Sequence, residues 1–596
     1  SGALTKSGTG TLTLAAAGNY TGATTVSAGV VAVQNATGLG TTDGATTVAS
    51  GAAVQIDGTG LTIAEPLTLN GTGVSTGGAL RNLANANTWS GAITLGSAAR
   101  INADGGTLTI ATGGLTGAFA LTVGGAGNTT ISAVIGTGTG TLTKDGAGTL
   151  TLSGTNTYTG TTTLTAGTLK AANTQALGTA AAPLSLGGGT LDLATDTSIT
   201  AYNTTVTASS TILSDRVASG AGVTHTLGTL SIGAQTLTVQ KGSNVASGTA
   251  GLTFGATTLT GGATLSTDTG ALTTLGAVTG TGQALTVTGA GNTTLSGALN
   301  TGASGALTKS GTGTLTLAAA GNYTGATTVS AGVVAVQNAT GLGTTDGATT
   351  VASGAAVQID GTGLTIAEPL TLNGTGVSTG GALRNLANAN TWSGAITLGS
   401  AARINADGGT LTIATGGLTG AFALTVGGAG NTTISAVIGT GTGTLTKDGA
   451  GTLTLSGTNT YTGTTTLTAG TLKAANTQAL GTAAAPLSLG GGTLDLATDT
   501  SITAYNTTVT ASSTILSDRA TSGAGVTHTL GTLSMGAQTL TVQAGSNVTS
   551  GTAGLTVGAT TLSATGATLS TDTGALTTLG SVTGAGNALT VTGAGN

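Results

Sequence analysis

The residues best suited to chemistry are two neighbouring carboxylates, Asp192 and Asp196, in Leu191-Asp-Leu-Ala-Thr-Asp196. Their spacing could place both on one face of a strand and its turn, as an acid–base pair or calcium ligands require. Sites that cleave polysaccharides also need basic and aromatic residues beside the acids, yet the chain holds only 13 Lys plus Arg and 2% aromatics. A solvated strand end with Asp in a turn explains both carboxylates. We predict no catalytic pair here.

The two histidines of the chain, His225 and His528, stand at matching places in its two halves. A Ser-His-Asp triad would have to use His225 with Asp215 as its orienting acid. Both residues lie in a polar, Gly-rich stretch that is typical of a loop. Zinc requires three or four ligands, which single histidines far apart do not supply. The sequence therefore predicts no catalytic, metal-binding or cofactor-binding residues and no enzyme activity.

Two kinds of glycine motif have functional counterparts in other proteins. Gly73-Val-Ser75-Thr-Gly77, repeated at 376–380, matches the G-x-S-x-G nucleophile elbow, which works only on a turn from a strand into a helix. The run Ile135-Gly-Thr-Gly-Thr-Gly-Thr141 lacks the Gly-Lys-Ser/Thr of a phosphate loop. No helix is predicted after either motif, so we interpret both as turns.

The aromatic residues Tyr20, Tyr158 and Trp89 recur at corresponding places along the chain. Aromatic side chains often anchor a binding partner, so a binding role is one interpretation. The interpretation we favour is that each fills a wide part of the core, where a large side chain has room.

The elements that must position all these residues are short β-strands. Charged residues make up 5% of the 596 residues, against about 25% in an ordinary soluble domain. Strong helix formers are scarce and the 109 glycines interrupt the chain often, while short runs of Thr, Val, Ile and Leu alternate with Gly, Asn and Asp turns. We predict an all-β protein. The chain has no Cys, so it has neither disulfides nor a Cys-based metal site.

The net charge of −5 argues against nucleic acid as a partner, since such proteins carry basic patches. No segment reaches 18 consecutive apolar residues, so we expect no direct membrane insertion by this chain. No signal peptide opens the sequence, and the chain starts and stops in the middle of a repeating pattern. We therefore expect a longer array of the same repeats on both sides.

Two near-identical tandem periods of about 303 residues make up the chain. Residues 1–216 recur unchanged at 304–519, and later positions diverge slightly, as where Lys241 becomes Ala544. We predict two β-helical repeats as domains, 1–303 and 304–596, the second truncated at its end.

A smaller motif recurs inside each period. Leu142-Thr-Lys144-Asp-Gly-Ala-Gly-Thr-Leu-Thr-Leu152 has counterparts that begin at Leu4, Leu307 and Leu445. Its alternating Leu and Thr place apolar side chains on one face of a strand. So small a unit cannot bury a core alone, but stacked units can, which favours a β-solenoid over a string of β-sandwich domains.

Two segments resemble known repeats. Gly146–Leu169, which reads GAGTLTLSGTNTYTGTTTLTAGTL, closely resembles the autotransporter-associated β-strand repeat. Leu80–Leu95 resembles a neighbouring stretch of the same large proteins. The resemblance implies an elongated right-handed parallel β-helix in the passenger region of a type V secreted, outer-membrane-anchored protein. The chain departs from a whole protein of that kind because it shows neither a signal peptide nor a translocator barrel.

Three functions remain open. The one we favour is a structural stalk, sheath or extracellular fibre on the cell surface, with stability summed over many contacts between turns. The second is an adhesin or biofilm protein whose flat Thr and Gly faces or open turn ends associate with other copies. The third, a polysaccharide-acting enzyme, is poorly supported by the scattered carboxylates. No ligand or glycosylation follows from the sequence.

Overall fold

The chain forms stacked β-strands, in a computed structural model that describes residues 2–596. It divides into two compact units, Ser1–Gly297 and Ala298–Asn596, each described by itself. No α-helix occurs in the described residues, and η1 (Val74–Thr76) and η2 (Val377–Thr379) are single 3-10 turns. This boundary lies six residues before the one that the sequence period suggests, between residues 303 and 304. The two need not coincide, because a tandem repeat has no unique starting residue.

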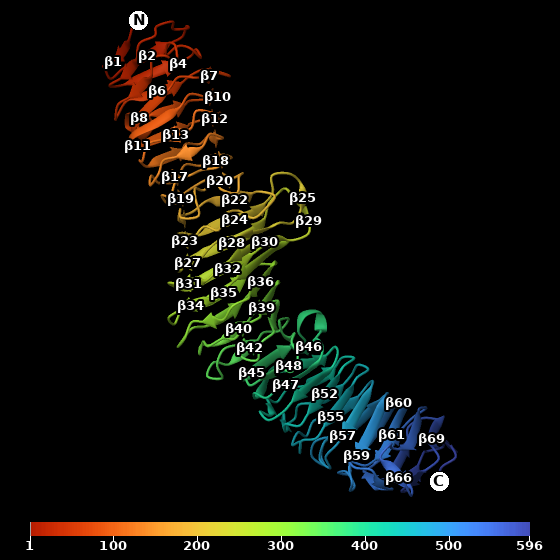
Figure 1. Cartoon of the computed structure of the whole chain (residues 1–596). Helices are drawn as coiled ribbons and strands as arrows, with labels where there is room; N and C mark the ends of the chain where they lie inside the picture. The colour runs from red at the N-terminus through yellow and green to blue at the C-terminus, as the bar shows by residue number, and fades with distance from the viewer. Residues whose placement is uncertain (1) are drawn as a thin grey trace. The chain divides into compact units, whose positions relative to one another are not determined.

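Each strand of the first unit pairs in parallel with the strand one turn further along the chain (Figure 1). The first stack comprises β1 (Leu4–Lys6), β3 (Thr24–Val26), β5 (Thr46–Val48), β8 (Leu67–Gly71), the start of β11 (Ile93–Ala103), β13 (Leu115–Thr116) and β16 (Ile135–Gly136). The second comprises β2 (Thr11–Leu14), β4 (Val30–Val33), β6 (Ala53–Ile56), β9 (Leu80–Asn82), the end of β11, β14 (Leu121–Gly124), β17 (Leu142–Lys144), β19 (Thr162–Leu164), β21 (Leu184–Leu186), β23 (Thr204–Val206), β27 (Leu230–Ile232), β31 (Thr257–Leu259) and β34 (Val278–Gly280).

The third stack carries the candidate site. It comprises β7 (Thr62–Ile63), β10 (Ala86–Trp89), β12 (Thr107–Ile110), β15 (Asn128–Ile131), β18 (Thr149–Leu152), β20 (Thr168–Ala171), β22 (Thr190–Ala194), β24 (Ser210–Asp215), β28 (Thr236–Lys241), β32 (Ala263–Thr267) and β35 (Leu285–Thr288).

A short fourth stack and a side extension begin after β24. The stack comprises β26 (Thr224–Thr226), β30 (Ala250–Phe254), β33 (Ala271–Leu275) and β36 (Asn292–Leu295). Two further strands, β25 (Gly220–Ala221) and β29 (Val245–Ser247), pair only with each other. We call residues 216–223 and 242–249 the side extension; it projects from the stacked strands of the first unit (Figure 1).

The core of the first unit is a set of apolar ladders along the stacks. Leu150, Leu169, Leu191 and Ile212 lie beside one another on successive strands of the third stack, and all four are fully buried. Strand residues alternate between the two faces, so the intervening residues of these strands point outward. Each turn therefore covers the apolar residues of the turn before it, as repeat proteins require.

The second unit repeats this arrangement from β38 (Leu307–Lys309) to β72 (Leu589–Thr592). Its counterparts of β22, β24 and β28 are β59 (Thr493–Ala497), β61 (Ser513–Asp518) and β65 (Thr539–Ala544), again paired in parallel. The two units contain about 27 turns in all. The predicted all-β parallel solenoid is confirmed, whereas a β-sandwich would need antiparallel sheets.

Candidate functional surface on strands β22, β24 and β28

A row of threonines crosses the outer face of three neighbouring strands. Thr190 on β22 lies beside Thr211 on β24, and Thr211 lies beside Thr238 on β28. The next residue of each strand is apolar and buried, so alternation turns the three threonines outward. Adjacent members of the row are about 4.8 Å apart, the distance between neighbouring strands.

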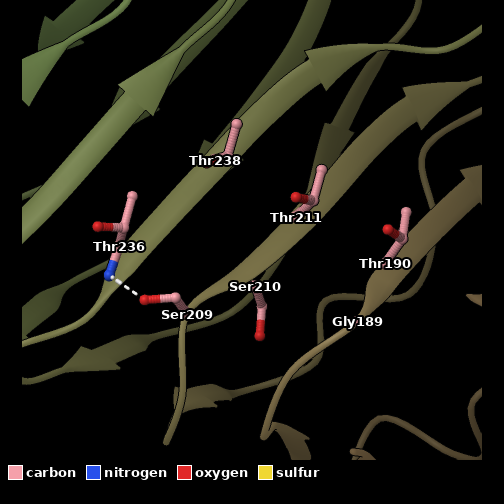
Figure 2. Close-up of a pocket in the computed structure, with 7 residues that line it drawn as sticks. All are labelled: Gly189, Thr190, Ser209, Ser210, Thr211, Thr236 and Thr238. Carbon is pink, nitrogen blue, oxygen red and sulfur yellow. Dashed lines mark hydrogen bonds between the residues drawn. The ribbon is translucent and has the colours of Figure 1, made fainter. Parts of the chain in front are cut away.

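The row lies in a shallow groove of about 360 Å³ (Figure 2). Two serines shape one of its walls: the Ser209 hydroxyl accepts a hydrogen bond from the Thr236 amide at 3.0 Å, and the Ser210 hydroxyl donates to the Ala208 carbonyl at 2.9 Å. The lining contains only glycine and hydroxyl-bearing residues: Gly189, Thr190, Ser209, Ser210, Thr211, Thr236 and Thr238.

The threonine hydroxyls of the groove are free of protein partners. Thr190, Thr211, Thr236 and Thr238 are half-buried, and none of their hydroxyl groups bonds to a protein group. The second unit has the same groove, with a volume of about 340 Å³. Its lining residues are Gly492, Thr493, Ser512, Ser513, Thr514, Thr539 and Thr541. No charged side chain lines either groove.

Charged residues lie further along the same strands, beginning with Asp192, two residues after Thr190. Asp192 on β22 pairs with Lys170 on β20 at 2.8 Å, and Asp196 pairs with Arg216 at 3.1 Å. The second unit repeats both ion pairs, Lys473 with Asp495 at 3.0 Å and Arg519 with Asp499 at 3.2 Å. The exposed Asp196 fits the predicted solvated turn. The same prediction is wrong for Asp192, which is 6% exposed because it lies within the strand.

His225 and Asp215 also lie near these charged residues. The predicted loop is found between them, in residues 216–223, but Asp215 itself ends β24 and His225 stands in β26, which pairs with β30. His225 is fully buried, and its Nε2 lies 3.0 Å from the Asp215 backbone carbonyl oxygen, while its Nδ1 has no partner. Burial lowers the pKa of His225, partly offset by the Asp215 carbonyl and by Asp192.

The structure thus brings together residues of two separate candidate sites, Asp192 with Asp215 and His225, while Asp196 contacts Arg216 instead. They do not form a hydrolytic triad. The nearby Ser214 is fully buried and its hydroxyl donates to the Gly251 carbonyl at 2.9 Å, and Asp215 accepts the Asn244 amide at 2.9 Å. Burial raises the pKa of Asp192, whose Oδ1 has no partner. Within residues 2–596, no three His, Cys, Asp or Glu residues group so as to hold a metal ion.

The G-x-S-x-G segment forms an exposed turn. Ser75 has a φ of 48° within η1, and the next element is the strand β9 rather than a helix. A nucleophile elbow needs a strand before the serine and a helix after it, so this serine is not placed for attack.

The recurrent aromatics lie in the core. Trp89 and Tyr158 are fully buried, and the Tyr158 hydroxyl lies 2.6 Å from the Thr162 hydroxyl. Tyr20 is half-buried and makes the corresponding contact with Thr24 at 2.8 Å. These positions favour the packing interpretation, because a side chain buried in the stack cannot contact an external partner.

Sequence reasoning missed a buried lysine in the small repeat. Lys144 is 2% exposed, and its ammonium donates to the carbonyls of Asp145 and Gly146, each at 2.7 Å, and of Ala166 at 3.1 Å. Burial lowers its pKa to about 8. Lysine occupies the same place in the other three copies: Lys6, Lys309 and Lys447. Its recurrence before a Gly-rich turn is the pattern that could have revealed it.

The fold and this repeated lysine contact define a parallel β-solenoid built from a short recurrent unit. A family described as Passenger-associated-transport-repeat matches residues 4–33, 142–171, 307–336 and 445–474. The recognition of these four segments as autotransporter passenger repeats is thereby confirmed. No significant match was found among curated proteins or solved structures. In residues 2–596, no helix has the length and apolar character needed to cross a membrane.

Proposed function

We propose that the chain is a stiff, non-catalytic scaffold in the passenger of an autotransporter, displayed on the cell surface and anchored in the outer membrane through a region outside this sequence. The observation that carries the proposal is the unbroken stacking of turns within each unit, with apolar ladders inside and passenger-associated repeats at four places. In such an array each turn stabilises its neighbours, so length is gained without a new core. The same repeats continue in the parent protein under this proposal.

Electron microscopy of the purified 596-residue chain at several concentrations tests the scaffold role. Uniform single particles whose length does not change with concentration support it. Particles that lengthen or bundle as the concentration rises favour a self-associating fibre instead. Surface labelling of cells that express the parent protein, with an antibody to this region, tests the location; an absence of label on intact cells contradicts it.

A second candidate function is adhesion, including self-association between cells. Hydroxyl columns on the first stack favour it: Thr5, Thr25 and Thr47 lie side by side on successive turns, and the column continues through Thr68 and Thr94. Such a column carries no charge to repel a second copy. Sedimentation of the chain across a concentration series checks this alternative, since an adhesin of this kind forms dimers or larger species.

A further inference from the structure

We propose that the hydroxyl groove on β22, β24 and β28, and its copy in the second unit, bind a neutral polysaccharide chain. The site is separate from the scaffold role, which needs only the stacked core. It deepens the adhesin alternative by naming the ligand class. The groove occurs once in each unit with equivalent lining residues, so the chain offers two such sites.

The chemistry of the lining selects an uncharged ligand rich in hydroxyl groups. A threonine hydroxyl both donates and accepts hydrogen bonds, which matches a sugar hydroxyl in either direction. The groove has no charged side chain to hold an anion or a cation. An apolar ligand would cover the hydroxyls of Thr190, Thr211 and Thr238 without providing partners for them, which is costly.

The lining residues of the groove are held in place before any ligand binds. Thr190, Thr211 and Thr238 stand on paired strands, so their spacing is set by the backbone hydrogen bonds of the sheet. The contacts of Ser209 and Ser210 fix the wall. A ligand therefore loses little free energy to ordering of the protein.

The row of hydroxyls extends past the groove, which favours a chain over a single sugar. Thr168 continues it from Thr190, and Ser266 and then Thr288 continue it from Thr238. A linear glycan lying across the strands would meet a hydroxyl on each turn, at intervals of about 4.8 Å.

The surrounding charges do not favour an acidic polysaccharide. Lys170 and Arg216 are each paired with an aspartate, and Lys241 at the end of β28 has no counterpart beside the second groove, where Ala544 takes its place. The recurrent aromatic residues are in the core, so the site lacks the stacking platform of many sugar-binding clefts. Affinity for a short glycan is therefore expected to be weak, at about millimolar dissociation constants.

Calorimetric titration of the whole chain with hexasaccharides tests the proposal. The probes are cellohexaose and maltohexaose, both neutral, and hexagalacturonate as the acidic comparison. We expect at least one neutral hexasaccharide to bind at two sites in each chain. Hexagalacturonate should bind at neither site. Failure of both neutral probes to bind at millimolar concentrations overturns the proposal.

Threonine-to-valine variants locate the binding. Valine keeps the shape and β-branching of threonine and removes the hydroxyl. Thr211→Val together with Thr514→Val should weaken binding about tenfold, and either change alone should leave one site. The matched control is Thr130→Val with Thr433→Val, outward threonines of the equivalent strands β15 and β52 (Asn431–Ile434), outside both grooves.

Equal loss of sugar binding in the groove and control variants overturns the proposal, and so does a groove variant that binds normally while its thermal unfolding is unchanged. If the groove changes instead abolish association between copies, the occupant is a second chain and the proposal is wrong. The scaffold role does not depend on any of these results, because particle shape in the microscope reports it separately.

Discussion

The ammonium of Lys144 donates a hydrogen bond to the carbonyl oxygen of Ala166 at 3.1 Å, and so links two successive turns of the solenoid through one side chain. The two residues are 22 positions apart in the chain. Lys447 makes the same contact with Ala469 in the second unit, also at 3.1 Å. The small repeat therefore supplies a side-chain hydrogen bond to the next turn.

Lys144→Met should weaken the contact between these two turns. Methionine keeps most of the buried aliphatic chain but leaves the carbonyls of Asp145, Gly146 and Ala166 without their donor, at a cost of about 1–3 kcal/mol. Hydrogen exchange in residues 145–148 and 165–168 should accelerate, with a lower thermal midpoint. Lys241→Ala is the control, because the second unit already has Ala544 at that place. Unchanged or slower exchange in Lys144→Met would show that burying the charge costs as much as its hydrogen bonds contribute.

Tyr158→Phe should destabilise the first unit modestly. The change removes the hydroxyl that lies 2.6 Å from the Thr162 hydroxyl in the core and keeps the ring. A lost buried hydrogen bond costs about 1 kcal/mol, whereas Tyr158→Ala, which also leaves a cavity, should cost about 3–5 kcal/mol. Chemical denaturation measures both. Tyr20→Phe should cost less, since Tyr20 is half-buried and water can replace the bond to Thr24; an equal cost at the two tyrosines would contradict this explanation.

Two buried glutamates should make the solenoid less stable as the pH rises. Burial raises the pKa of Glu65 to about 7 and that of Glu368 to about 8, from 4.5, despite the hydrogen bonds that each accepts from a threonine. The folded state therefore holds a proton that the unfolded chain releases. Its stabilising effect is complete below pH 4.5 and is lost as the pH rises through 7 to 8.

Thermal unfolding between pH 4.5 and 8.5 measures the effect of the glutamates, which is at most about 3 kcal/mol for Glu65 and about 5 kcal/mol for Glu368. In the double variant Glu65→Gln, Glu368→Gln both side chains stay neutral at every pH. The decline in its thermal stability between pH 4.5 and 8.5 should therefore be much smaller. A decline of the same size in this variant would assign the pH dependence to other groups.

The strand faces could be predicted from the sequence because the period of a strand is two residues. In Thr149-Leu-Thr-Leu152 the threonines are half-buried and the leucines fully buried, as their alternation requires. The same pattern in four repeats was enough to predict stacking. The predicted packing role of Tyr158 and Trp89 agrees with their complete burial, because a large aromatic side chain in a unit with so few apolar residues is needed in the core.

The groove could not be predicted, because turns differ in length. The Gly188 amide meets the Ser210 hydroxyl 22 residues along the chain, whereas the Ser209 hydroxyl meets the Thr236 amide 27 residues along. Only the register set by these turns shows that Thr190, Thr211 and Thr238 are neighbours. The proximity of Asp192 to His225 could not be predicted for the same reason. It depends on the path of the chain between the end of β24 and the start of β26.

Acidification should loosen the side extension next to His225. Burial lowers the pKa of this imidazole below its ordinary value of 6.5, so the unfolded state binds more protons in the window between the two pKa values. The local stability is therefore present above pH 6.5 and falls as the pH drops through the lowered pKa. The groups near the imidazole are the carboxylates of Asp192 and Asp215, which favour its charged form and reduce the effect.

Hydrogen exchange of residues 216–223 and 242–249 at pH 7.5 and pH 5, corrected for the intrinsic pH dependence of exchange, measures this loosening. Exchange should be faster at pH 5 in the wild-type chain, and the ratio between the two pH values should approach one in His225→Gln, whose amide does not titrate. The matching residues 519–526 and 545–552 near His528 should keep their pH dependence in that variant and so provide an internal control. Slower exchange at pH 5 in the wild-type chain would mean that Asp192 and Asp215 stabilise the charged imidazole by more than its burial costs.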